Sequence, residues 1–223
     1  MITVHHLNNS RSQRVLWLLE ELGLEYDIRH YQRDPVTMLA PESLRKIHPL
    51  GKSPVITDGD LTIAESGAII EYLVERYGQG RLAPAVGTPE RLRYTYWLHY
   101  AEGSAMPLLV LKLIFGRLGK PPMPALIRPI AGLIGKGLQD RFIDPQLARH
   151  RDYLEAELGH TGWFAGADFS AADIQMSFPI EAMHARGGAD ARYPHLQEFL
   201  TRIHARPAYV RALQRGGPYE LGR

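Results

Sequence analysis

The sequence predicts an α/β domain followed by an all-helical domain. Two observations lead to this fold class. Strand-like and helix-like segments alternate in the order β-α-β-α-β-β-α up to residue 80, and no strand pattern follows residue 90. A segment with two prolines and two glycines, QGRLAPAVGTPE, lies between the two parts, as a linker does. We therefore expect a first domain at 1–80, a linker at 81–90 and a helical domain at 91–223.

The first helix and the two strands around it have clear local patterns. Residues 2–7 read as a strand, and residues 26–31 alternate as a second one. Between them, SQRVLWLLEEL has apolar residues at helical spacing and is followed by Gly23, a common helix stop. Because a helix joins the two strands, we expect them to pair in parallel.

A short helix, a β-hairpin and a further helix complete the first domain. APESLRKIHP indicates a short helix that ends at Pro49, and DGD at 58–60 marks a tight turn between two strands. A helix over 66–77, closed by Gly78, follows. These elements predict a mixed four-stranded sheet with helices on both faces.

The second half has only helical patterns. We expect a long helix over 89–118 with a bend at Pro107, and another over 125–159 with a break at Asp144-Pro145. Helical segments at 170–187 and 194–216 follow; the last residues, GGPYELGR, read as a loose end that could cover a pocket.

Composition excludes several classes of function. The net charge is +2 and no run is dense in Lys or Arg, so we expect no nucleic-acid partner. The chain has no cysteine, which excludes disulfides, thiolate metal ligands and a thiol nucleophile of its own. The ten histidines form no ligand motif, and His5 and His6 point to opposite faces of a strand, so we expect no metal.

The sequence also predicts a cytoplasmic protein. It opens on a strand pattern rather than on a basic and apolar leader. Its most apolar stretch, 105–118, is too short to span a bilayer and contains Lys112 and Arg117.

Pro54 stands where the third strand begins. A cis Ser53–Pro54 bond would leave the backbone of Ser53 free to pair with an extended, peptide-like ligand. A trans proline would only protect an edge strand. The local pattern leaves both interpretations open.

Glu65 and Ser66 stand where the helix over 66–77 begins. A helix N-terminus and a hydroxyl suit a carboxylate, and the Glu65 carboxylate can hold an ammonium, so the pair could bind an α-amino-acid head group. Ser66 could equally be only an N-cap.

The segment NNSRSQR at 8–14 follows the first strand, at the end where open α/β sheets bind ligands. Asn9, Ser10 and Ser12 could each present a hydrogen-bond donor there. The alternative is that Ser10 or Ser12 only caps the helix.

These motifs together resemble the cytosolic glutathione transferase superfamily. KSPV at 52–55 and ESGAI at 65–69, followed by an all-helical domain, are its pattern, and the resemblance covers essentially the whole chain. FSAADIQMSFPI is similar to the family's capping box, with Ser170 as cap and Asp173 reaching back, a folding role. The chain is most similar to a theta-like branch of bacteria and fungi.

The resemblance implies a thioredoxin-like first domain that binds glutathione as co-substrate. By this resemblance, the backbone of Ser53, before a cis Pro54, pairs with the cysteinyl unit of glutathione. Lys52 binds the glycyl carboxylate, and Glu65 and Ser66 bind the γ-glutamyl head group. The thiol-activating residue would be Ser10, four residues before Arg14 as in theta-like members, with Asn9 as its rival and Ser12 as a weaker one.

The helical domain is then expected to form the site of a small hydrophobic electrophile. Met106, Leu109 and Leu113 lie at i, i+3 and i+7, although such a stripe is also typical of a protein core. The reaction implied is thiolate attack on the electrophile, or reduction of an organic hydroperoxide. The family also implies a homodimer, to which the aromatics at 94–97 could contribute unless they are core.

Two alternatives stay open beside the transferase interpretation. One is another glutathione-dependent enzyme on this fold, such as a peroxidase, dehalogenase or isomerase. The other is a non-catalytic binding or regulatory relative, which typically loses the thiol-activating or glutamyl-binding residues. Because Ser10, Pro54, Glu65 and Ser66 are all present, the sequence favours an enzyme.

Overall fold

The structure, a computed structural model, describes residues 1–187, 190–217 and 219–221. Its N-terminal part contains one sheet with the strand order β2-β1-β3-β4. The strands are β1 (Ile2–Leu7), β2 (Tyr26–Tyr31), β3 (Val55–Asp58) and β4 (Leu61–Ala64). β1 pairs with β2 in parallel and with β3 antiparallel, and β3 and β4 form the hairpin that the Asp-Gly turn predicts. The predicted mixed sheet is confirmed.

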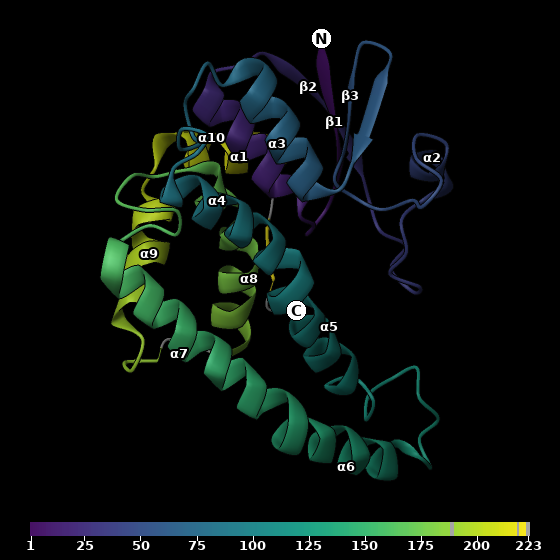
Figure 1. Ribbon diagram of the computed structural model, residues 1–223. Helices are drawn as coiled ribbons and strands as arrows, with labels where there is room; N and C mark the ends of the chain where they lie inside the picture. Colours follow the sequence, from purple (N-terminus) through teal and green to yellow (C-terminus); the bar gives the residue numbers. More distant parts are fainter. Residues whose placement is uncertain (188–189, 218, 222–223) are drawn as a thin grey trace.

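Three helices accompany this sheet. They are α1 (Ser12–Leu22), α2 (Glu42–Arg45) and α3 (Ser66–Tyr77). Figure 1 shows α1 and α3 together on one side of the strands and α2 on the other. α1 ends at Gly23, whose φ of 69° lies in the left-handed region that glycine adopts without a steric penalty. The predicted order β-α-β-α-β-β-α is therefore confirmed.

The rest of the described chain is helical, and its described residues contain no strand after Ala64. The helices are α4 (Pro89–Tyr100), α5 (Met106–Phe115), α6 (Arg128–Leu138), α7 (Asp144–Thr161), α8 (Ala171–Gly187), α9 (Pro194–His204) and α10 (Pro207–Gly216). Two π-helical turns, η1 (Ala101–Ala105) and η2 (Gln139–Ile143), join α4 to α5 and α6 to α7. No helix among the described residues is long and apolar enough to cross a membrane. The domain limits at 80 and 90 stay a prediction.

The two predicted helix interruptions are π-helical turns placed just before the prolines. η1 ends two residues before Pro107, and η2 ends two residues before Pro145. A proline has no N–H and its ring crowds the carbonyl four residues earlier, so the preceding turn widens. The helices therefore deviate before each proline, upstream of the predicted positions. As a result η1 points Glu102 toward the N-terminal part of the molecule.

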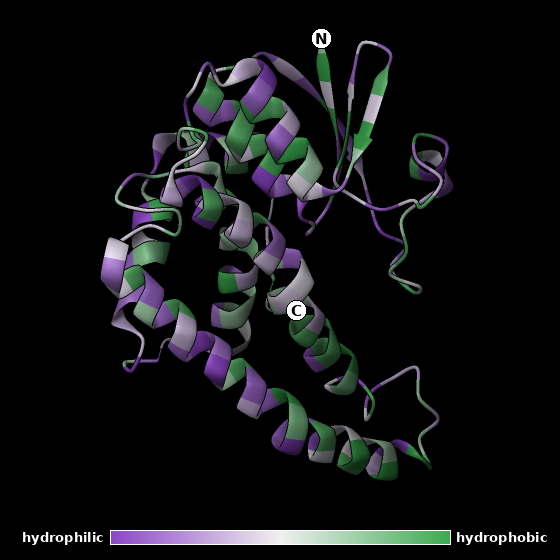
Figure 2. Ribbon diagram, viewed as in Figure 1, coloured by the Kyte–Doolittle hydropathy of each residue, from purple (hydrophilic) through white to green (hydrophobic). Residues whose placement is uncertain are grey.

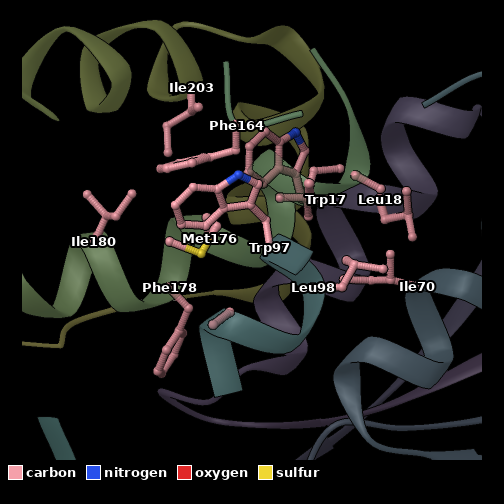
Figure 3. Packing of buried hydrophobic residues seen from close by; sticks show 14 of the residues in the cluster. Trp17, Leu18, Ile70, Trp97, Leu98, Phe164, Met176, Phe178, Ile180 and Ile203 are labelled. Carbon is pink, nitrogen blue, oxygen red and sulfur yellow. The ribbon is translucent and has the colours of Figure 1, made fainter. Parts of the chain in front are cut away.

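One apolar core joins the two parts of the molecule. Figure 3 shows Trp17 of α1, Trp97 of α4 and Met176 of α8 gathered within it. The ring centroids of Trp97 and Phe164 are 4.6 Å apart. Because α1 belongs both to the sheet layer and to this core, the arrangement of the two halves is fixed by burial.

Asp173 closes the start of α8 as the capping-box interpretation predicts. Its carboxylate accepts hydrogen bonds from the backbone N–H of Ser170 at 2.8 Å, from the Ser170 hydroxyl at 3.1 Å and from the backbone N–H of Phe164 at 2.9 Å. Asp173 lies away from every cleft described below, in keeping with a role in folding.

Candidate active site

A polar cleft brings together all five residues predicted to bind the tripeptide. Lys52, Ser53, Pro54, Glu65 and Ser66 line it, although they come from two separate segments. The cleft has about 620 Å³ of empty volume. Its other lining residues are Arg11, His48, Leu50, Ala64 and Glu102.

The Ser53–Pro54 peptide bond is cis, so the trans alternative is wrong. The Ser53 hydroxyl donates to the backbone carbonyl of His5, with 3.1 Å between the two oxygens. This bond attaches the segment before β3 to β1, and it places Ser53 beside the residues that follow β1.

Glu65 and Ser66 do not serve as simple caps. Glu65, the N-cap position of α3, has a φ of 70° and makes no side-chain cap bond. A non-glycine residue in this region costs on the order of 1–3 kcal/mol, and such strain is typical of functional sites. The Ser66 hydroxyl bonds to side chains from other elements, so the interpretation that Ser66 is only an N-cap is wrong.

Arg14 and Glu102 hold the Ser66 hydroxyl in place from both halves of the molecule. Arg14 donates to the Ser66 hydroxyl at 3.0 Å and to the Glu102 carboxylate at 2.5 Å. Ser66 itself donates to the same carboxylate at 3.3 Å. Arg14 is 1% exposed and also donates to the backbone carbonyl of Gln175 on α8. These charge-assisted bonds fix the serine at the mouth of α3.

Glu102 also forms an ion pair with a second cation, Arg11. The Nε of Arg11 lies 3.0 Å from a carboxylate oxygen of Glu102. Burial on its own would raise the pKa of Glu102, but the charges of Arg14 and Arg11 outweigh it and hold the pKa below its usual value. Glu102 is therefore ionised at neutral pH. Arg11 lines the cleft beside Glu102, while Arg14 lies buried behind it.

Ser10 lies at the junction between this cleft and a second one. It is 4% exposed, and its hydroxyl oxygen lies 2.7 Å from that of Ser12 and 3.2 Å from that of Ser53. The backbone N–H of Ser12, the first residue of α1, donates to the Ser10 hydroxyl at 3.3 Å, so Ser10 caps the start of this helix as the alternative interpretation allowed. Ser10 also joins the end of β1 to the segment that contains Pro54.

His6 extends this row of hydroxyl groups inward. Its Nδ1 lies 2.8 Å from the Ser12 hydroxyl oxygen. Burial first, and then the charge of His30, lowers the pKa of His6 to about 4. A neutral His6 thus pairs with the Ser12 hydroxyl, which in turn pairs with the Ser10 hydroxyl.

The second cleft is larger and more apolar. Met106 and Leu113, both predicted for the electrophile, line it together with Val110 and Phe178. Leu109 does not line it: this residue is 1% exposed and packs in the core. Of the predicted stripe, Met106 and Leu113 therefore line the cleft, whereas Leu109 belongs to the core. Val110 lines the cleft in place of Leu109.

Asn9 faces the second cleft and contacts the C-terminal tail. Its φ is 48°, and its side-chain oxygen accepts a hydrogen bond of 2.8 Å from the backbone N–H of Glu220. Glu220 and Leu221 line the same cleft. The tail therefore covers part of this pocket, as one interpretation of the sequence allowed, and Asn9 attaches it.

Known proteins resemble this chain throughout its length. Two protein families match the sequence. The family "Glutathione S-transferase, N-terminal domain" matches residues 1–75, and the family "Glutathione S-transferase, C-terminal domain" matches residues 143–207. Glutathione S-transferase 3 of Schizosaccharomyces pombe is 35% identical over 208 residues, which are 93% of this chain and 85% of the relative. The chain belongs to the glutathione transferase superfamily. Glutathione S-transferase 1 of Saccharomyces cerevisiae is 32% identical over 94% of this transferase-family chain and 93% of the relative.

The solved structures agree with the family and with its fold. A crystal structure of a glutathione S-transferase from Actinobacillus pleuropneumoniae superposes with a TM-score of 0.79 at 32% identity, and covers 100% of this chain and 96% of its own. The predicted fold, a thioredoxin-like domain followed by an all-helical domain, is thus confirmed for this transferase-family protein.

Arg11 and Glu102 are the charged residues of the polar cleft that the sequence did not predict. Arg11 lies between the candidate residues Ser10 and Ser12, and no sequence motif marks it. Glu102 lies in the long helical segment, where only the following Gly103 and the approach of Pro107 marked an irregularity. The polar residue in an irregular turn was the available signal.

Proposed function

We propose that this chain catalyses the attack of the glutathione thiolate on an apolar electrophile. The observation that carries the proposal is the junction of the two clefts, because Arg11 and Ser53 line both of them. Ser10 donates a hydrogen bond to Ser53 at this point. A thiol held beside Ser53 would therefore meet an apolar molecule lying against Met106 and Leu113.

The groups of the polar cleft complement a γ-glutamyl tripeptide along its length. Lys52 provides a cation for the glycyl carboxylate, and the backbone of Ser53 provides partners for the cysteinyl unit. At the other end Glu65 holds the ammonium, while Ser66 and the N-terminus of α3 hold the γ-glutamyl carboxylate. The relatives' names, glutathione S-transferases, support the same ligand.

Ser10 and Arg11 would hold the sulfur as a thiolate. A free thiol has a pKa of about 8.5, and both a nearby cation and a hydroxyl donor favour its anion. Because the chain has no cysteine, the attacking sulfur belongs to the ligand. The thiol proton leaves to water, the sulfur bonds to the electrophilic carbon, and a halide leaves from an aryl halide. With a hydroperoxide, two glutathione thiols are oxidised to the disulfide and the peroxide becomes an alcohol and water.

The direct test is a turnover assay with glutathione and an activated aryl halide, with an organic hydroperoxide as a second arm. We expect saturable product formation with at least one of them, and its loss in a Glu65→Gln variant. A well-folded chain that binds glutathione and turns over neither electrophile class would support the non-catalytic alternative instead.

A cytoplasmic location and a homodimer stay predictions. Tyr94 and Trp97 are core residues, which leaves the half-exposed Tyr96 for a contact between subunits.

A further inference from the structure

Helix α6 has its large apolar side chains on the outside. In a globular protein an amphipathic helix normally turns this face to the core. Figure 2 shows apolar residues recurring along α6, at the end of the molecule opposite the sheet. The exposed ones are Leu126 at 93%, Ile127 at 47%, Ile130 at 62%, Leu133 at 72%, Ile134 at 56% and Leu138 at 40%. We call these six residues the α6 outer face.

The inner side of α6 explains this reversal, because it consists of glycine. A Cβ on Gly135 would lie 2.5 Å from the carbonyl oxygen of Phe115, and a Cβ on Gly119 would lie 3.1 Å from the Cα of Gly132. The helix thus packs its backbone directly against the end of α5 and the turn after it. No space is left for large side chains on that side, so the Ile and Leu residues lie outward.

The charge around the α6 outer face is strongly positive. Residues 115–143 contain five Lys or Arg and one acidic residue, Asp140, so they carry a net charge of +4 in a chain whose total is +2. Asp140 is itself paired with Lys136 at 2.7 Å. Arg117, Lys120 and Arg141 are exposed, and no ion pair within the described ranges involves them. The remainder of the chain is correspondingly negative.

We propose that the α6 outer face docks this protein on an anionic lipid surface. A helix with one continuous Leu/Ile face and flanking Lys/Arg is the type that lies in the interface of a bilayer, where acidic headgroups attract the cations. Figure 1 shows α6 at the end of the molecule opposite the sheet, where a flat surface can approach it. A second copy of the chain is a poorer occupant, because pairing two such faces would bring like charges together.

This docking would place the apolar cleft close to the lipid. Arg117 lines that cleft and belongs to the turn between α5 and α6. Leu113, one turn earlier on α5, lines it too. An apolar compound dissolved in the bilayer would therefore leave the lipid beside the proposed electrophile site.

The test is flotation of the purified full chain with vesicles of phosphatidylcholine, with and without phosphatidylglycerol. We expect at least tenfold stronger binding to the anionic vesicles, weakening as NaCl is raised. Leu133→Gln combined with Ile134→Gln should reduce that binding at least tenfold, and Lys120→Gln combined with Arg141→Gln should reduce it as well. Val36→Gln combined with Val86→Gln is the matched control, since both valines are 86% exposed and lie outside the α6 outer face.

Sedimentation velocity and glutathione calorimetry of the same variants complete the test. All variants should bind glutathione like the wild type, which separates this proposal from the proposed function. Absence of binding to anionic vesicles, or equal binding by the Leu133/Ile134 variant, would overturn the proposal. A dimer that only the Leu133/Ile134 variant dissociates would also overturn it and make the face a contact between copies.

Discussion

The hydroxyl of Ser10 donates a hydrogen bond to the hydroxyl of Ser53, with 3.2 Å between the two oxygens. One residue follows β1, and the other precedes the cis Pro54. Wherever Ser53 holds a ligand thiol, Ser10 is within reach of its sulfur. The row of hydrogen-bonded side chains continues through Ser12 to a neutral His6.

Replacement of Ser10 by alanine should raise the pKa of bound glutathione. A hydrogen bond to a charged group contributes about 1.5–3 kcal/mol, so we expect a rise of one to two in the thiol pKa and a fall of about 10–100-fold in turnover at neutral pH. Titration of thiolate absorbance in the complex measures the pKa. Asn9→Ala is the paired variant and should leave it unchanged; a larger rise for Asn9→Ala would make Asn9 the activating residue.

His6 should make stability depend on pH. Its pKa in the folded chain is about 4, against 6.5 ordinarily, so the folded chain binds fewer protons there than the unfolded chain between these values. The stability it contributes is complete above about pH 6.5 and is lost as the pH falls toward 4, on the order of 3 kcal/mol in total. His6→Gln, which cannot titrate, should lack this loss in urea unfolding.

The His6→Gln comparison is needed because Asp173 acts in the opposite direction. Burial raises the pKa of Asp173 to about 6, so the folded chain binds more protons there than the unfolded one, and its contribution grows as the pH falls from 6 to its ordinary 3.8. The difference between wild type and His6→Gln at each pH cancels the Asp173 effect. A difference that stays constant from neutral pH to pH 4 would contradict the burial of a neutral His6.

Glu102→Gln should destabilise the fold and weaken glutathione binding together. It removes the charge that pairs with the fully buried Arg14, and an unpaired buried cation costs roughly 2–4 kcal/mol in the free energy of unfolding. The Ser66 hydroxyl would also exchange a charged acceptor for a neutral amide oxygen, which accepts a weaker hydrogen bond. Glu198→Gln is the control, because its pair with Arg202 is 3.8 Å long and exposed, and it should cost less than about 1 kcal/mol. Equal effects of the two substitutions would show that the Arg14–Glu102 pair has no special role.

Asp173→Ala should lower stability without changing the site. Three hydrogen bonds at the start of α8 are lost, and buried N–H groups remain unpaired, so we expect a loss of roughly 2–4 kcal/mol in urea unfolding. The affinity for glutathione, measured at low temperature where the variant is folded, should stay within about twofold of the wild type. A large loss of affinity in folded protein would place Asp173 in the binding machinery.

Leu109 and Leu113 should respond differently to truncation. Leu109→Ala leaves a cavity in the core and should cost roughly 2–5 kcal/mol of stability. Leu113→Ala, on the cleft wall, should cost much less stability and instead raise KM for apolar electrophiles. Chemical unfolding and kinetics of the two variants, side by side, measure this. Reversed effects would show that the wall of the cleft has been assigned to the wrong residues.

The sequence predicted the elements of the first domain because their signals are local. Gly23, the Asp-Gly turn and the period of the apolar residues act within a few positions, and the structure confirms each. The helix deviations were foreseen at Pro107 and Asp144-Pro145 but lie before them, because a proline perturbs the turn that precedes it.

The site was only partly predictable because it is assembled across long sequence separations. The motif residues at 52–54 and 65–66 were recognisable, but the contact of Arg14 with Glu102 joins positions 88 residues apart. Helical spacing could not separate Leu109 in the core from Leu113 on the cleft wall, since both fit one stripe. The outward orientation of the apolar face of α6 could not be predicted from the sequence either. It depends on the close backbone contact at Gly135, which is set by the packing of α5.

The most direct test of the central claim is calorimetric titration of glutathione into the purified protein and into a Glu65→Ala, Ser66→Ala double variant. The polar cleft predicts saturable binding by the wild type that the double variant loses, while a Val86→Ala control binds normally. Absence of binding by the folded wild type, or undiminished binding by the double variant, would contradict the assignment of this cleft to glutathione.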